Sequence, residues 1–434
     1  MKITSSCVQR VSKAGPLGLP EASHRTRLAS LIVALGCGVV SVASESLEVT
    51  DDLEVSGFVR VIGGYLNSDG NSVDGYRDGI SLHQQSLIAI QPTYHVTDQL
   101  SGTVQWLGHS GAGRESGIEW AYLTYDLDDQ WQIKAGKLRM PFFYYSDSID
   151  VGYSYPWISP PMQLYNNKLF PTFEGGNVSY SSSFGSYSLR LEGLYGHYNN
   201  DYVMIGGTRL DAEAHFDDMY GFNLNLGRGN YNLRLAYHTG FSQTSLGFLK
   251  PLKTALEQAG FSESAETLAA TGPMSVYSVG LNYENFSGFL RGEWVRTVTE
   301  LDFSPTQTSY YLMAGKYVGD WTLHLTFACA ENTRTRPADE LQPFVEDPTI
   351  NPGLAQLAAG YYYTYDRIPT GGLNSVTLGT RWDFRANMAL KLDVSYLKET
   401  SPYSGFFISR DADTQQNADT QTGTLYQVGW EWVF

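Results

Sequence analysis

The sequence has little charge, few cysteines and a single long apolar run. Charged residues make up 17% of the 434 residues, where about 25% is usual for soluble domains. Of the three cysteines, Cys7 and Cys37 lie in a segment that we expect to be removed. A disulfide framework and a cysteine-based zinc site are therefore not predicted.

The one long apolar run, LASLIVALGCGVVSVA, has the pattern of a secretory signal. Arg25 and Arg27 precede it, and it ends in small residues. With about 15 apolar residues it is short for a transmembrane helix. We predict that residues 1–43 are a signal peptide, with a start codon placed too early or an extended leader, and that residues 44–434 form one domain. An uncleaved anchor and lipid attachment at Cys37 are the alternatives.

Removal of this segment changes the charge balance of the chain. The remainder would carry 24 basic and 44 acidic residues, a net charge of −20. Such a charge disfavours nucleic acid as a partner. A chain exported without another apolar helix can still span a membrane as a closed barrel, because helices and closed barrels satisfy every backbone polar group in lipid.

Short stretches of alternating apolar and polar residues are abundant. In the final LYQVGWEWVF, one face of a strand would carry Tyr426, Val428, Trp430, Trp432 and Phe434. This pattern recurs about sixteen times, mostly over the ~9 to 11 residues that a tilted strand needs to cross a bilayer. The predicted strands are 53–65, 82–96, 100–108, 117–127, 131–140, 173–182, 186–197, 217–227, 231–240, 275–285, 288–298, 308–318, 321–329, 373–383, 388–398 and 422–434.

Tight and long connections alternate along these strands. A tight link rich in turn-forming residues follows every even-numbered strand. A longer connection follows every odd-numbered strand. The tight links are TDQ, DDQ, SSFG, GRGN, NFS, GD and FRAN. Outer-membrane barrels have short periplasmic turns and long outer loops, so the sequence predicts an all-β transmembrane antiparallel β-barrel.

Charged residues indicate which face of each strand points inward. In YSLRLEGLY, Leu189 and Leu191 alternate with Arg190 and Glu192. An Arg facing lipid near the midplane would cost about 2 to 4 kcal/mol, so Arg190 is predicted to face the lumen. The same alternation places on the inner face Arg234, His238, His324, Lys391 and Asp393. A barrel of about 16 strands is too wide for side chains to fill, which predicts a water-filled channel.

With its signal peptide, the opening LEVSGFVRVIGGY, this strand count and the ending GWEWVF, the chain resembles the sixteen-stranded porins of Gram-negative bacteria over residues 45–434. The resemblance implies an outer-membrane location among lipid and lipopolysaccharide, a homotrimer and no cofactor. The final aromatic stripe ending in Phe434 resembles the signal that the barrel-assembly machinery recognises.

The stretch GKLRMPFFYYSDSIDVGYSYPWISPP resembles the passage from the fifth porin strand into the third outer loop, which narrows the channel. The resemblance implies that Asp147 and Asp150 are loop acids that face basic residues of the wall. The candidate bases are Arg60, Arg190, Arg234, Arg291 and Arg381. The spacing of Lys137 and Arg139 predicts that they share one face, either at the constriction or at the level of the lipid headgroups.

Three pairs of opposite charge are two residues apart on predicted inner faces: Arg190 with Glu192, Arg291 with Glu293, and Lys391 with Asp393. They would form either a transverse field across the pore or solvated wall charges that cancel. Ion selectivity does not follow from them.

Three loop features are ambiguous. Leu249, Leu252, Leu256 and Ala259 predict a short helix capping its own barrel rim, with a lid or subunit contact as the alternative. Acidic positions in a late loop suggest a mobile loop more than a calcium site, because they lack EF-hand spacing. These positions are Asp411, Asp413 and Asp419.

The cluster HFDD, residues 215–218, is the best candidate for catalysis, but no partnering motif occurs elsewhere and a chance cluster is favoured. We predict no catalytic residue and no metal. The predicted function is a passive diffusion channel for small hydrophilic solutes and ions. A substrate-selective channel for phosphate or a sugar, and an outer-membrane hydrolase, are the alternatives. Tyr and Trp in the third loop are the basis of the sugar hypothesis.

Overall fold

The computed structural model describes residues 47–434, apart from 69, 112–113, 166–169, 206–207, 269, 301–303, 334–335, 367, 369–370, 402–404 and 410–419. The predicted signal peptide and the acidic positions Asp411, Asp413 and Asp419 lie outside the described residues.

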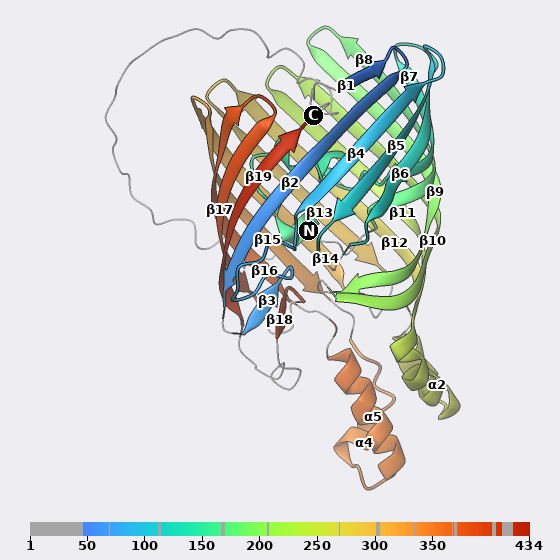
Figure 1. The fold of residues 1–434 in the computed structure, drawn as a ribbon. Coiled ribbons are helices and arrows are strands. Elements are labelled where there is room, and N and C mark those ends of the chain that lie inside the picture. Colours follow the sequence, from blue (N-terminus) through green and yellow to red (C-terminus); the bar gives the residue numbers. More distant parts are fainter. Residues whose placement is uncertain are drawn as a thin grey trace. The chain divides into compact units, whose positions relative to one another are not determined.

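Sixteen strands form a closed antiparallel barrel (Figure 1). Strands adjacent in the chain pair with each other, and the last strand pairs with the first, so the barrel has no open edge. The strands are β2 (Leu53–Asn67), β4 (Leu87–His95), β5 (Leu100–His109), β6 (Gly117–Asp126), β7 (Trp131–Arg139), β8 (Thr172–Phe184), β9 (Tyr187–Ile205), β10 (Thr208–Arg228), β11 (Tyr231–Leu246), β12 (Ala270–Asn285), β13 (Gly288–Thr299), β14 (Thr306–Val318), β15 (Trp321–Thr333), β16 (Gly371–Arg385), β17 (Met388–Glu399) and β19 (Thr422–Val433).

The predicted strands and tight turns are confirmed, with one long connection as the exception. Each predicted tight link joins two strands through two to four residues. The prediction of a long loop after the seventh strand is wrong, because β9 and β10 continue as a paired ribbon to Ile205 and Thr208. Before the first barrel strand, β1 (Leu47–Thr50) pairs with β2. Within the first and last long connections, β3 (Asn71–Val73) pairs with β18 (Phe407–Ser409).

The inner and outer faces of the barrel differ as the alternation predicts. On β15, His324 is 2% exposed, whereas Leu323 and Leu325 are 46% and 53% exposed on the outer surface. Aromatic pairs form a belt at the short-turn end, as is typical of a membrane interface. They include Trp131 with Tyr180, Tyr231 with Tyr283, Trp321 with Trp382, and Trp432 with Phe434. At the other end lie Tyr237 with Tyr277 and Tyr65 with Tyr426.

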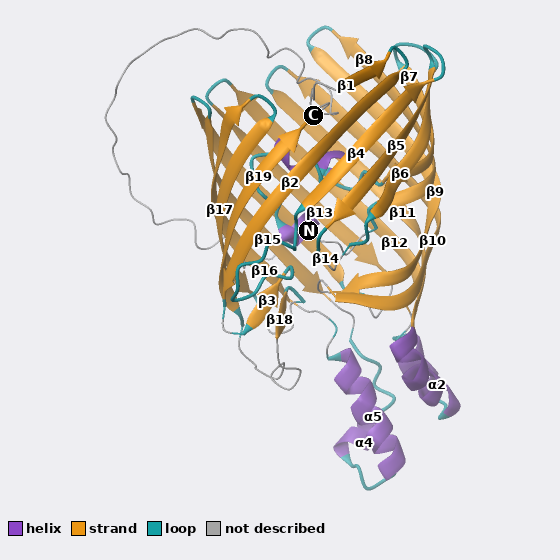
Figure 2. Ribbon diagram, in the orientation of Figure 1, coloured by secondary structure: helices purple, strands orange, loops and turns teal. Residues whose placement is uncertain are grey.

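Two long connections combine into a helical module beyond the barrel end (Figure 2). Its helices are η3 (Gly247–Leu249), α2 (Lys250–Gln258), α3 (Ser262–Glu266), α4 (Gln342–Glu346) and α5 (Pro352–Tyr365). Leu256, Leu341 and Tyr361 belong to its buried core. The helix predicted at 249–259 is therefore present, and it packs against α5. None of the helices in the described ranges is long and apolar enough to cross a membrane.

Candidate functional site

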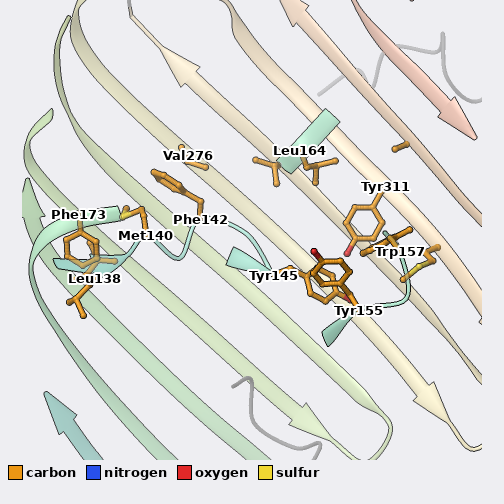
Figure 3. Close-up of a cluster of buried hydrophobic side chains, with 14 of the residues drawn as sticks. Leu138, Met140, Phe142, Tyr145, Tyr155, Trp157, Leu164, Phe173, Val276 and Tyr311 are labelled. Atoms are coloured by element: carbon orange, nitrogen blue, oxygen red, sulfur yellow. The ribbon is translucent and has the colours of Figure 1, made fainter. Parts of the chain in front are cut away.

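The described part of the connection between β7 and β8, residues 140–165 and 170–171, folds inside the barrel and is called the third loop below. It contains η1 (Ser146–Ser148), η2 (Gly152–Ser154) and α1 (Met162–Tyr165). Figure 3 shows Tyr145, Tyr155 and Trp157 of this loop gathered against the wall near Tyr311. The Trp157 and Tyr311 rings meet edge to face with centroids 5.3 Å apart. Apolar packing therefore holds one side of the loop to the barrel.

The third loop covers one part of the inner surface. We call the strands that it covers, β11–β17, β19 and β2, the covered wall. The inner-face residues of β4–β9 that make no described hydrogen bond or ion pair with the loop are called the open wall. Those that are not buried include Gln91, Thr93, Lys134, Asn177, Arg190 and Glu192.

Lys391 binds the backbone of the third loop from the covered wall. Its ammonium donates to the carbonyls of Gly152, Tyr155 and Trp157 at 2.7, 2.8 and 2.7 Å. It also lies 2.6 Å from the carboxylate of Glu431. Lys391 is only 2% exposed, and a buried charge requires such partners. The third loop therefore supplies the hydrogen-bond acceptors that the buried ammonium of Lys391 requires.

Three arginines of the covered wall bind loop carbonyls in the same way. Arg60 also pairs with Glu431 at 3.1 Å. Each guanidinium presents several donors in a fixed plane, which suits a row of carbonyls. The pairs are Arg60 with Ile158, Arg381 with Tyr153 and Tyr155, and Arg234 with Pro141 and Phe142.

Acidic side chains of the covered wall accept the loop's backbone N–H groups. Asp393 accepts from Ile158 N at 2.7 Å, and Glu293 accepts from Tyr144 N at 2.8 Å. The Tyr165 hydroxyl also donates to Glu293. Donors and acceptors of the wall thus match those of the loop along most of its length, which fixes its path.

Asp150 lies in a buried ion cluster. It pairs with Arg139 of β7 and with Arg114. Glu119 also pairs with both arginines, at 3.3 Å from Arg139 and 2.7 Å from Arg114. Burial acts to raise the pKa of Asp150, but the two guanidinium groups outweigh it and hold that pKa well below its ordinary value. Asp150 is thus a loop acid that faces Arg139 of the wall, and none of the five candidate bases named from the sequence forms a described ion pair with it.

Sequence reasoning missed Arg114 and Glu119. They lie at the end of the β5–β6 connection and in β6, and no spacing links them to the third loop. Only the folded barrel brings these segments together.

Lys137 and Arg139 do not share one face. Lys137 pairs in register with Glu174, whose side chain is 64% exposed, and so lies on the outer surface. Arg139 turns into the ion cluster and lies over the Trp120 ring at 4.9 Å. The strict alternation ends there because β7 ends at Arg139 and the chain turns into the barrel.

Of the three predicted charge pairs, one is an ion pair among the described residues. Arg190 lies 3.9 Å from Glu192, which also accepts from Asn177. Arg291 instead pairs with Glu284 at 2.6 Å and donates to the Tyr145 hydroxyl at 3.0 Å. Lys391 and Asp393 bind the loop separately, as described above.

The members of the HFDD cluster bind different strand neighbours. A ring nitrogen of His215, Nδ1, lies 2.8 Å from Asn199 Oδ1. Asp217 accepts from Gln243 at 3.2 Å, and Asp218 accepts from the Tyr195 hydroxyl at 3.0 Å. The arrangement holds the β9–β11 strands together and does not align a base with a nucleophile.

Comparison with known proteins identifies the fold. No protein-family model and no curated protein matches the sequence. The anion-selective porin from Comamonas acidovorans has a similar structure, with a TM-score of 0.52 and 15% identity over 88% of this chain and 99% of that one. The outer-membrane channel DcaP of Acinetobacter baumannii is similar with a TM-score of 0.51 and 11% identity, over 88% of this chain and 97% of that one. OmpT, an outer-membrane protein of Vibrio cholerae, is similar with a TM-score of 0.52 and 10% identity, over 90% of this chain and 100% of that one. The chain has the fold of these outer-membrane proteins, in agreement with the predicted porin-like fold.

Proposed function

We propose that this protein is an outer-membrane diffusion channel whose passage runs between the third loop and the open wall. The observation that carries the proposal is the fixed path of the loop, whose carbonyls are bound by four cationic side chains of the covered wall. A loop held along one wall leaves the other wall for solute. Solutes would be sorted by the width of this passage and by its charges.

The charged groups along this passage are Asp147, Lys134, Arg190 and Glu192. Asp147 is exposed on the third loop, and it is close enough to Lys134 and Glu192 to act on both electrostatically. The wall side of the passage therefore carries both basic and acidic groups, and the loop side carries the acidic Asp147. Gln91 and Thr93, which are partly exposed, add neutral hydrogen-bonding groups, which suits small hydrophilic solutes as well as ions.

The contacts of the aromatic residues favour a passive channel over a sugar-selective one. A sugar slide would need ring faces open to the passage, but Tyr145, Tyr155 and Trp157 are buried against the covered wall. A hydrolase would need an aligned base and nucleophile, which the HFDD cluster does not supply. The passage itself needs no cofactor.

The proposed assembly is a homotrimer that folds with help from the barrel-assembly machinery. A trimer form of Vibrio cholerae OmpT has this fold. The backbone of Phe434 pairs with Gly57 at 2.8 and 2.9 Å, which seals the last strand to the first. The machinery would recognise the aromatic stripe of β19 before β19 pairs with β2.

Single-channel recording of the mature chain in a planar bilayer tests the proposal. We expect ohmic currents in KCl that added sugar or phosphate does not block at saturable sites. Saturable block by either solute would favour a substrate-selective channel. Hydrolysis of lipid or peptide without conductance would favour the hydrolase.

A further inference from the structure

The polar lining of the proposed passage gives way to apolar side chains toward the long-loop end. On β9 the inner face carries Arg190 and Glu192 and then, farther along the strand, Leu194. We call the buried inner-face residues at this level of β7–β10 the apolar layer. They are Leu138, Phe173, Leu194 and Met219, each at most 6% exposed.

The third loop packs onto the apolar layer from inside the barrel. Figure 3 shows Met140 of the loop beside Leu138 and Phe173 of the wall. Phe142 and Phe170, near the two ends of the loop, meet edge to face with ring centroids 5.2 Å apart. Apolar surfaces in contact exclude water, so the passage is closed to water above β7–β10.

The extended part of β9 and β10 adds two aromatic rings to this closure. Tyr198 and Phe216 pair in register on the two strands. The Phe170 ring stacks on Tyr198 with centroids 4.8 Å apart and an interplanar angle of 22°, and it lies 4.6 Å from the Phe216 ring. We call these three side chains the ring cluster. It joins the returning end of the third loop to the wall.

The ring cluster is a weaker attachment than the polar contacts on the covered wall. Lys391 holds the loop through three hydrogen bonds from a buried charge, and such bonds are among the strong ones. Contacts between neutral rings contribute less. Of these two attachments, the ring cluster is therefore the one that separates first.

We propose that the apolar layer and the ring cluster form a hydrophobic gate at the outer end of the passage. The gate is closed in this structure and opens when Phe170 leaves Tyr198 and Phe216. Ions do not cross a closed apolar constriction, because its walls offer no hydrogen bonds to replace hydration water. The inference rests on the proposed function and adds regulation to it.

Single-channel recording of F170A tests the gate. The ring contacts with Tyr198 and Phe216 are lost in this variant, so we expect the ratio of closed to open time to fall about tenfold. F184A is the matched control, because it removes a ring stacked on Tyr187 at the short-turn end, away from the gate. Its closed and open times should equal those of the unmodified protein.

Substitution of Met219 tests whether the gate works by excluding water. Glutamine has nearly the size of methionine but forms hydrogen bonds with water, so M219Q should hydrate the apolar layer and lengthen the open times. M219L keeps the position apolar and should leave the open times unchanged.

A cross-link tests whether Phe170 must move. The double variant F170C/F216C lacks two of the three rings and should open like F170A. Joining its two introduced thiols with a reducible bifunctional reagent should hold the channel closed, and reduction should restore opening.

Equal closed and open times in F170A and the unmodified protein, with M219Q and M219L also alike, would overturn the gate and leave the proposed function intact. Full conductance of the cross-linked double variant would overturn the gate as well. Absence of current from the unmodified protein and from every variant would overturn the proposed function, and the gate with it.

Discussion

The covered wall and the open wall have the same alternating sequence pattern but use their charges differently. On the covered wall, Lys391 and Arg60 are buried and bind loop carbonyls. On the open wall, Arg190 and Lys134 are partly exposed, and Arg190 has a single long ion pair at 3.9 Å. An inward charge therefore takes one of two roles, according to whether the third loop lies over it.

The difference follows from the energetics of burial. A charge removed from water must recover its hydration through hydrogen bonds, and loop carbonyls supply them on the covered wall. A charge that stays in water needs no such partner and contributes little to stability. The covered wall should therefore govern stability and the loop's path, and the open wall should govern which solutes pass.

Lys391→Met should have the largest effect on the folded state. It leaves Glu431 and three carbonyls without their shared donor, and breaking a buried pair in this way costs about 3 to 5 kcal/mol. We expect a lower unfolding midpoint and noisy single-channel currents from a released loop. The matched variant K134M on the open wall should alter the current without this loss of stability. Equal stability losses in both would contradict the distinction between the walls.

Asp150→Asn should have the next largest effect, and that effect should depend on pH. Hydrogen bonds to charged partners contribute about 1.5 to 3 kcal/mol, and D150N weakens those from Arg114 and Arg139. Since the folded-state pKa of Asp150 is lowered, its stabilisation is fully present above the unfolded pKa of about 3.9 and is lost as pH falls toward the folded value.

Unfolding of the native chain and D150N from pH 7 to pH 2 measures this dependence. The difference in free energy should be constant down to about pH 5 and shrink below about pH 4. A difference that disappears already near neutral pH would mean that Asp150 has no lowered pKa. D147N is the matched control, because Asp147 is exposed and forms no ion pair among the described residues.

The sequence predicted the barrel because its strongest signals are local. The alternation of apolar and polar residues around His324 can be recognised within a few residues. A tight turn such as GRGN likewise depends on residues that are adjacent in the chain. The β9–β10 ribbon was missed because apolar and polar residues alternate only weakly there. A strand shows strict alternation only where one of its faces contacts lipid, and the ribbon extends beyond that part of the barrel.

The roles of the charges could not be predicted because they depend on what lies opposite. Lys391 and Lys134 look alike in sequence, yet the third loop covers one and not the other. Arg114 joins Asp150 from a separate connection. Such partners are far apart in the chain, and spacing within a strand carries no information about them.

Asp147→Asn should have a smaller effect that falls on selectivity. A charge about 8 Å from a passing ion in water contributes roughly 0.5 kcal/mol, or about a twofold change in relative permeability. We expect D147N to shift reversal potentials in a KCl gradient toward anions and K134Q to shift them toward cations. Their unfolding midpoints should stay close to that of the native chain. A shift of the same sign in both variants would place the passage away from these residues.

Leu256→Ala should have the smallest effect on the channel, because it acts on the helical module outside the barrel. Leu256 is fully buried there among Tyr361 and Leu341, and Leu→Ala in a core costs about 2 to 5 kcal/mol. Limited proteolysis should cut residues 247–268 faster in L256A, while conductance and the unfolding midpoint of the barrel stay unchanged. Thr254→Ala, a change at an exposed position of the same helix, is the control for proteolysis. A change in conductance would show that the module reaches into the passage and that the two walls are not the whole of the channel.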